Sequence, residues 1–129
     1  MVEAITTKYN VDKSRVYLMG IATGGFMANR LACEAPETFA GVVTFAGSTW
    51  KDSNRCDPPI GAATNVLNIH GDADLTVPIG GGTNFAGVEF PSADVTVDTF
   101  AEKFGCVPRA AADTSGGFEL PASPKSPTG

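Results

Sequence analysis

The feature that most constrains this chain is a glycine-rich turn between an apolar run and a helical pattern. Residues 16–19 read Val-Tyr-Leu-Met, and the turn Gly20-Ile-Ala-Thr-Gly24 follows at once. The run does not alternate between apolar and polar residues, so we expect a strand of a parallel sheet that is buried on both faces. A helix is predicted from residue 26 to 35, where side chains recur at helical spacing before Pro36, namely Met27, Arg30, Leu31 and Glu34.

Two more apolar runs, residues 41–46 and 65–69, predict further strands. Strand, helix and strand with short connections make a right-handed βαβ unit. Residues 75–91 read as a loop, and Ser92 can cap a helix that runs to Phe104 and stops at Gly105. We therefore expect an α/β fold with three αβα layers and a mostly parallel sheet over residues 1–108. Residues 109–129 are rich in Ser, Pro and Gly and predict a flexible tail or linker.

The turn at residues 20–25 permits three interpretations. It can be a glycine-rich connection without chemistry. It can be a dinucleotide-binding turn, but the next strand ends in Phe45-Ala46-Gly47 and lacks the acidic residue that would bind the ribose. It can also be a nucleophile elbow, Gly-x-Ser-x-Gly, in which glycines flank a strained apex because a Cβ there would collide with neighbouring chain. Ala22 stands where that motif has its serine.

A candidate acid follows the third apolar run, where the chain reads His70-Gly71-Asp72-Ala73-Asp74. Hydrolases with an elbow carry nucleophile, acid and histidine in that chain order, so Asp74 is the candidate that would orient an imidazole. A strand-end turn or cap is the alternative role for Asp74. His70 is the only histidine and precedes the acid, so we expect it to make a structural hydrogen bond. One histidine with two aspartates is too small a ligand set to predict a metal site.

Composition narrows the function classes. The 129 residues carry a net charge of −5, and no Lys/Arg cluster is visible, which argues against a nucleic-acid partner. The sequence contains no run of 18 apolar residues, so no membrane span is predicted. Among the three cysteines, Cys33 falls in the predicted helix as a buried free thiol, while Cys56 and Cys106 lie in or beside loops and could pair.

Three separated motifs resemble those of the extracellular poly(3-hydroxybutyrate) depolymerase and feruloyl esterase group of α/β-hydrolases. They are VDKSRVYLMGIATGGFMANRLACEAPETFAGVVTFAG, LNIHGDADLTVPIGGG and KFGC, which occur in the family's order between residues 9 and 106. The resemblance implies secretion and hydrolysis of carboxylic esters through an acyl-enzyme, without a cofactor. It places Ala22 at the nucleophile, the Thr23 amide at one oxyanion donor and Asp74 at the acid. It also implies a Cys56–Cys106 disulfide.

The chain departs from the family pattern at several points. The nucleophile is alanine, and the family's histidine should lie beyond residue 110, where this sequence has none. The resemblance also places the family's first strands and second oxyanion donor before residue 1. We therefore expect that this chain does not hydrolyse esters. We also expect it to correspond to the central part of the family's fold. The alternative function is a non-catalytic domain that binds an ester, acyl or aromatic ligand.

Overall fold

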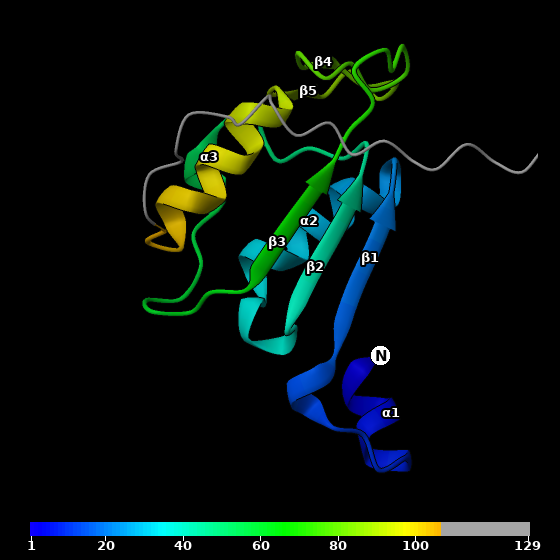
Figure 1. Ribbon diagram of the computed structural model, residues 1–129, viewed down its shortest axis with the longest axis vertical. Coiled ribbons are helices and arrows are strands. Elements are labelled where there is room, and N and C mark those ends of the chain that lie inside the picture. The colour runs from blue at the N-terminus through cyan, green and yellow to red at the C-terminus, as the bar shows by residue number, and fades with distance from the viewer. Residues whose placement is uncertain (107–129) are drawn as a thin grey trace, which may run out of the picture.

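The computed structural model describes residues 1–106 and contains a three-stranded parallel sheet. Its strands are β1 (Tyr17–Ile21), β2 (Gly41–Phe45) and β3 (Asn65–Ile69), in the order β1-β2-β3. Figure 1 shows the three arrows pointing the same way, so their carboxyl ends meet at one edge. The register pairs Ile21 with Phe45 and Phe45 with Ile69, which aligns the last residues of all three strands at that edge.

Two helices pack on one face of the sheet, α2 (Thr23–Glu34) and α3 (Ala93–Lys103). The side of α2 that packs in the core is made of small residues such as Ala28 and Ala32, which are at most 1% exposed and lie in one cluster with Val42 of β2. Small side chains let the helix approach the strands closely. Phe100 brings α3 into the same cluster. The predicted cap is confirmed, because the Ser92 side chain accepts a hydrogen bond from the Val95 amide at 3.2 Å.

The remaining elements are short and connect these layers. They are α1 (Val2–Lys8), the 3₁₀ turns η1 (Lys13–Arg15), η2 (Pro36–Thr38) and η3 (Ser53–Arg55), and an antiparallel hairpin of β4 (Gly82–Thr83) and β5 (Glu89–Phe90). The hairpin lies in the segment that the sequence predicts to be loop. The Asn84 side chain forms its turn by accepting hydrogen bonds from the Ala86 and Val88 amides, both at 3.0 Å.

The opposite face of the sheet is exposed along β1, contrary to the prediction of a strand buried on both faces. Tyr17, Met19 and Ile21 are 69–70% exposed, whereas Leu18 between them packs against the core. Successive side chains of a strand point to opposite faces, and both described helices of the main layer lie on the Leu18 side. The apolar run therefore has one covered and one uncovered face within residues 1–106.

The disulfide joins Cys33 to Cys56, so the prediction of a Cys56–Cys106 bridge is wrong, as is that of a free thiol at Cys33. Cys33 lies on the buried side of α2, and its Cα is 5.2 Å from that of Cys56, within the range that a disulfide needs. Cys106 lies beyond the end of α3 as an exposed free thiol. Spacing along the chain could not reveal that the buried side of α2 faces the segment after β2.

The parallel sheet with its βαβ connection confirms the α/β class and the partial α/β-hydrolase architecture. Of the expected layers, the described residues contain the sheet and one helical layer. The predicted tail at residues 109–129 lies outside the described residues. None of the helices within residues 1–106 combines the length and the apolar character that crossing a bilayer requires.

Candidate functional site

The turn after β1 is a sharp bend with Ala22 at its apex. Ala22 has φ 49° and ψ −117°, a conformation that costs an L-residue about 1–3 kcal/mol. The residue on one side ends β1, and Thr23 on the other begins α2. Two hydrogen bonds hold the bend: the Ala22 amide donates to the Phe45 carbonyl at 2.9 Å, and the Ala22 carbonyl accepts from the Phe26 amide at 3.0 Å. The local geometry is that of the predicted elbow.

The glycines around the apex differ in whether their positions have room for a side chain. A Cβ on Gly20 would lie 2.1 Å from the Gly24 carbonyl oxygen, so this position cannot hold a side chain. A Cβ on Gly25 would lie 3.0 Å from the Gly47 Cα, and one on Gly47 would lie 2.7 Å from the Gly25 Cα. Gly24 has open space where a Cβ would stand. The expectation that both flanking glycines avoid a collision therefore holds for Gly20 and fails for Gly24.

The start of α2 points backbone amides toward the apex. Thr23 and Gly24 occupy the first turn, where amides have no carbonyl partner within the helix. Such amides, with the partial positive charge of a helix N-terminus, stabilise an oxyanion. The methyl group of Ala22 provides neither a nucleophile nor a proton.

Asp74 lies in the loop after β3, and one of its oxygens is fully engaged. Its Oδ1 accepts hydrogen bonds from the Thr76 amide at 2.8 Å and the Val77 amide at 2.9 Å. These bonds, the one from Val77 above all, hold the pKa of the Asp74 carboxyl below its ordinary value of 3.8. The carboxylate is therefore ionised at neutral pH, and no hydrogen bond from the described residues is found at its Oδ2.

His70 closes the same loop. Its Nε2 lies 2.7 Å from the Val77 carbonyl oxygen, and because a carbonyl can only accept, Nε2 carries the proton. Nδ1 is buried and has no hydrogen-bond partner among the described residues. This is the structural hydrogen bond expected from the sequence, and it leaves the lone pair that could accept a proton on Nδ1, which is buried.

The sheet brings Ala22 and the Asp74 loop to one edge. Ala22 follows the last residue of β1, and His70 follows the last residue of β3. Strands in a sheet lie about 4.8 Å apart, so the ends of β1 and β3, separated by β2, are roughly 10 Å apart. Cys56 and Cys106, also candidates from the sequence, do not come together.

A cavity of about 200 Å³ lies beside the start of α2. Three segments form its wall: the outer side of α2, the residues just after β2 and the β4–β5 hairpin. Its lining is Thr23, Phe26, Met27, Arg30, Ser48, Thr49, Trp50, Asn84, Val88, Glu89 and Phe90. Aromatic and aliphatic side chains with a few polar groups are typical of small-molecule sites.

Apart from Thr23, the sequence analysis did not assign these lining residues to a site. Ser48-Thr49-Trp50 follows β2 after two intervening residues and therefore reaches the same sheet edge as Ala22, which the order of the strands could have indicated. The contribution of Phe90 depends on the hairpin, which the sequence analysis did not predict. Within residues 1–106, no group of three His, Cys, Asp or Glu side chains could hold a metal ion.

Stability should depend on Asp74 in a pH-dependent way. A carboxyl whose pKa is lowered on folding stabilises the native state above its unfolded pKa, and this stabilisation is lost as the pH falls from about 3.8 through the lower folded value. We expect Asp74→Asn to lower the urea midpoint between about pH 5 and 8 and to have a smaller effect below about pH 4. Asp72→Asn, at an exposed carboxyl two residues earlier, is the matched control. A pH-independent effect of Asp74→Asn would contradict the assignment.

Several known proteins are similar in sequence to part of this chain. NocK of Nocardia uniformis subsp. tsuyamanensis is 40% identical over 81 residues, which are 63% of this chain and 23% of that protein. Feruloyl esterase B of Neurospora crassa is 45% identical over 47 residues, 36% of this chain and 16% of the relative. Poly(3-hydroxyalkanoate) depolymerase C of Paucimonas lemoignei is 37% identical over 51 residues, 40% of this chain and 12% of the relative.

The matching part thus spans less than a quarter of the length of these relatives. No solved structure matches the chain with comparable significance. The family model for Phospholipase/Carboxylesterase matches residues 2–101, a range that includes the bend at Ala22, the Asp74 loop and most of α3. The chain therefore belongs to the phospholipase/carboxylesterase family of α/β-hydrolases.

Proposed function

We propose that this chain carries the ester site of its family in an inactive form, which binds a carboxylic ester or its acyl group without hydrolysing it. The observation that carries this proposal is Ala22 at the apex of the elbow. In a serine esterase the apex hydroxyl attacks the ester carbonyl, a histidine takes its proton and later protonates the leaving alcohol, and water releases the acid. A methyl group cannot perform the first of these steps.

The neighbouring groups support the same assignment. The Thr23 amide would donate to the carbonyl oxygen of a bound ester, and the Oδ2 of Asp74 would accept from an imidazole. His70, the only histidine in the sequence, instead donates its Nε2 proton to the Val77 carbonyl. The base is therefore missing from this chain together with the nucleophile.

The cavity beside α2 supports an aromatic or other apolar acyl group as the ligand. Phe26 and Phe90 meet edge to face in its wall, with ring centroids 5.3 Å apart, and Trp50 adds a third aromatic side chain. Relatives named for feruloyl and poly(3-hydroxyalkanoate) esters agree with a carboxylic ester as the ligand class. We also propose an extracellular location, because the Cys33–Cys56 disulfide needs an oxidising compartment.

Hydrolysis assays test the loss of activity. We expect no turnover of p-nitrophenyl butyrate or methyl ferulate above the buffer rate by the purified chain. Any turnover that persists in Ala22→Gly and in His70→Ala would come from a contaminant. Turnover that either substitution abolishes would overturn the proposal.

Restoring the serine hydroxyl at position 22 tests whether the missing nucleophile alone or also the missing histidine base prevents hydrolysis. Ala22→Ser alone should remain inactive, because the only imidazole, that of His70, is held by the Val77 carbonyl and its unprotonated Nδ1 is buried. Binding should nevertheless be measurable, since methyl ferulate in the cavity would quench the emission of Trp50, the only tryptophan. Absence of quenching up to the solubility limit of the ester would contradict the binding part of the proposal.

A further inference from the structure

The cavity depends on three separate segments that must stay together. The outer side of α2 contributes Thr23 and Phe26, the segment after β2 contributes Ser48 and Trp50, and β5 contributes Phe90. These segments lie far apart in the sequence, so their relative positions are set by contacts between them. Each pair of walls is joined by a different kind of contact.

Two of the junctions are non-covalent. The Phe26 and Phe90 rings join α2 to β5 at a centroid distance of 5.3 Å. The buried Ser48 hydroxyl joins the segment after β2 to the end of the hairpin and to α3, since it donates to the Pro91 carbonyl at 2.9 Å, next to β5, and lies 2.8 Å from the hydroxyl of Thr96 in α3.

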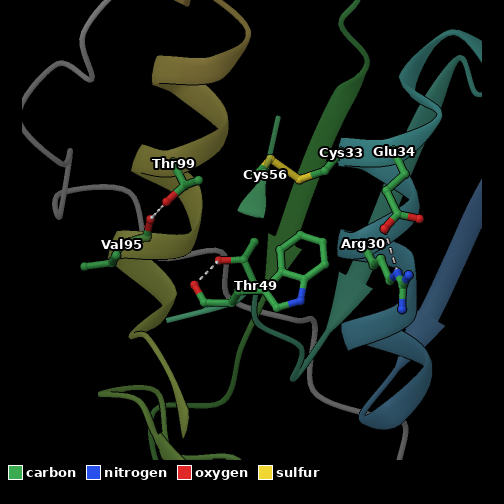
Figure 2. The surroundings of a disulfide bond; sticks show 8 residues. Arg30, Cys33, Glu34, Thr49, Cys56, Val95 and Thr99 are labelled. Carbon is green, nitrogen blue, oxygen red and sulfur yellow. Dashed lines mark hydrogen bonds and ion pairs between the residues drawn. A yellow bond between two sulfur atoms is a disulfide. The ribbon is translucent and has the colours of Figure 1, made fainter. Parts of the chain in front are cut away.

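The third junction, between α2 and the Trp50 segment, is the disulfide. Residues 51–55 are all exposed, and Cys56 is the first buried residue after them, with 0% exposure. Trp50 packs against the core cluster that contains Cys33 and Cys56, and the Arg55 guanidinium lies 5.4 Å from the centre of its ring. Figure 2 shows the sulfur–sulfur bond reaching from Cys33 on α2, with Arg30 and Glu34 on the same helix.

We propose that the Cys33–Cys56 disulfide is a positioning element of the ligand cavity, which fixes Trp50 against α2 in the arrangement that binds the acyl group. The inference rests on the proposed function for the identity of the ligand. Without the crosslink, the exposed segment 51–55 would no longer be anchored at Cys56, and Trp50 would lose its fixed position.

Reciprocal linkage tests this in the unmodified chain. Dithiothreitol can supply two electrons and two protons, which break the sulfur–sulfur bond into two thiols while the reagent closes to its cyclic disulfide. If the crosslink favours binding, a bound ligand must stabilise the crosslink by the same factor. We expect saturating methyl ferulate to raise the ratio of reduced to oxidised dithiothreitol at half-reduction by about tenfold, measured by alkylation and mass. An unchanged ratio, with methyl ferulate bound, would overturn the proposal.

A ligand-free measurement distinguishes this inference from the proposed function. In Cys33→Ser/Cys56→Ser we expect acrylamide to quench Trp50 about twofold more strongly than in the unmodified chain, while circular dichroism shows the helices retained. Cys106→Ser removes the exposed thiol outside the crosslink and is the matched control. Equal quenching in all three proteins would overturn the positioning role. Disulfide-dependent quenching without methyl ferulate binding would support it and would contradict the proposed ligand. If the double variant does not fold, the linkage measurement decides alone.

Discussion

Gly20→Ala is expected to prevent stable folding, with a loss of about 4 kcal/mol or more of unfolding free energy. The added Cβ would stand 2.1 Å from the Gly24 carbonyl oxygen, and that oxygen belongs to the first turn of α2. Backbone on both sides of the contact is fixed, on one side by β1 and on the other by the helix. No rotamer change can relieve the overlap, so the elbow itself would have to open.

The matched control is Gly24→Ala in the same motif. Its Cβ would meet no atom within 4 Å, and alanine favours the helix by up to about 1 kcal/mol over glycine. Urea unfolding followed by circular dichroism should therefore show Gly24→Ala at or above the stability of the unmodified chain. Equal stability of Gly20→Ala and the unmodified chain would mean that the chain does not form this bend.

Self-association of the described domain is the second large effect we expect, and it follows from the uncovered sheet face. Five apolar side chains on this face are 40–70% exposed: Tyr17, Met19, Ile21, Leu67 and Ile69. Together they expose on the order of 600 Å² of side-chain surface, which equals the largest apolar patches of ordinary monomers. Two copies that bury these faces would reach about 1,200 Å², the lower limit of specific interfaces.

Charge on the face should prevent this association. We expect Met19→Glu/Leu67→Glu to weaken dimerisation at least about tenfold in sedimentation equilibrium, because each carboxylate would have to be buried in the interface. Ile60→Glu places the same charge on a fully exposed loop residue and should associate like the unmodified chain. Identical masses for the two Glu variants at every concentration would show that this face is not the contact.

The sequence predicts the elements that local patterns determine. The third strand is predicted at residues 65–69 and found there, and the Ser92 cap and the Gly105 stop of α3 are as expected. Helix α2 begins at Thr23, three residues earlier than predicted, because the bend at Ala22 leads directly into its first turn. The glycines and apolar runs around the bend are local signals, which is why its geometry could be anticipated.

Features that depend on distant contacts could not be predicted. The large side chains that indicate α2, such as Met27, lie on its outer side, whereas alanines and Cys33 face the core. The disulfide partner of Cys56 follows from that orientation and not from spacing. The cavity likewise needs a hairpin whose signal, Asn84 ahead of Gly87, is short and easily read as plain loop.

The bend at residue 22 is built by its neighbours rather than by the side chain at its apex. The close approach of Gly20 to Gly24 and the amide bond to Phe45 would persist with any small residue there. The backbone around this position would therefore hold a hydroxyl or thiol side chain at the same apex that now carries the Ala22 methyl group. One substitution at such an apex can therefore remove or add a hydroxyl or a thiol without changing the bend, both in evolution and in protein engineering.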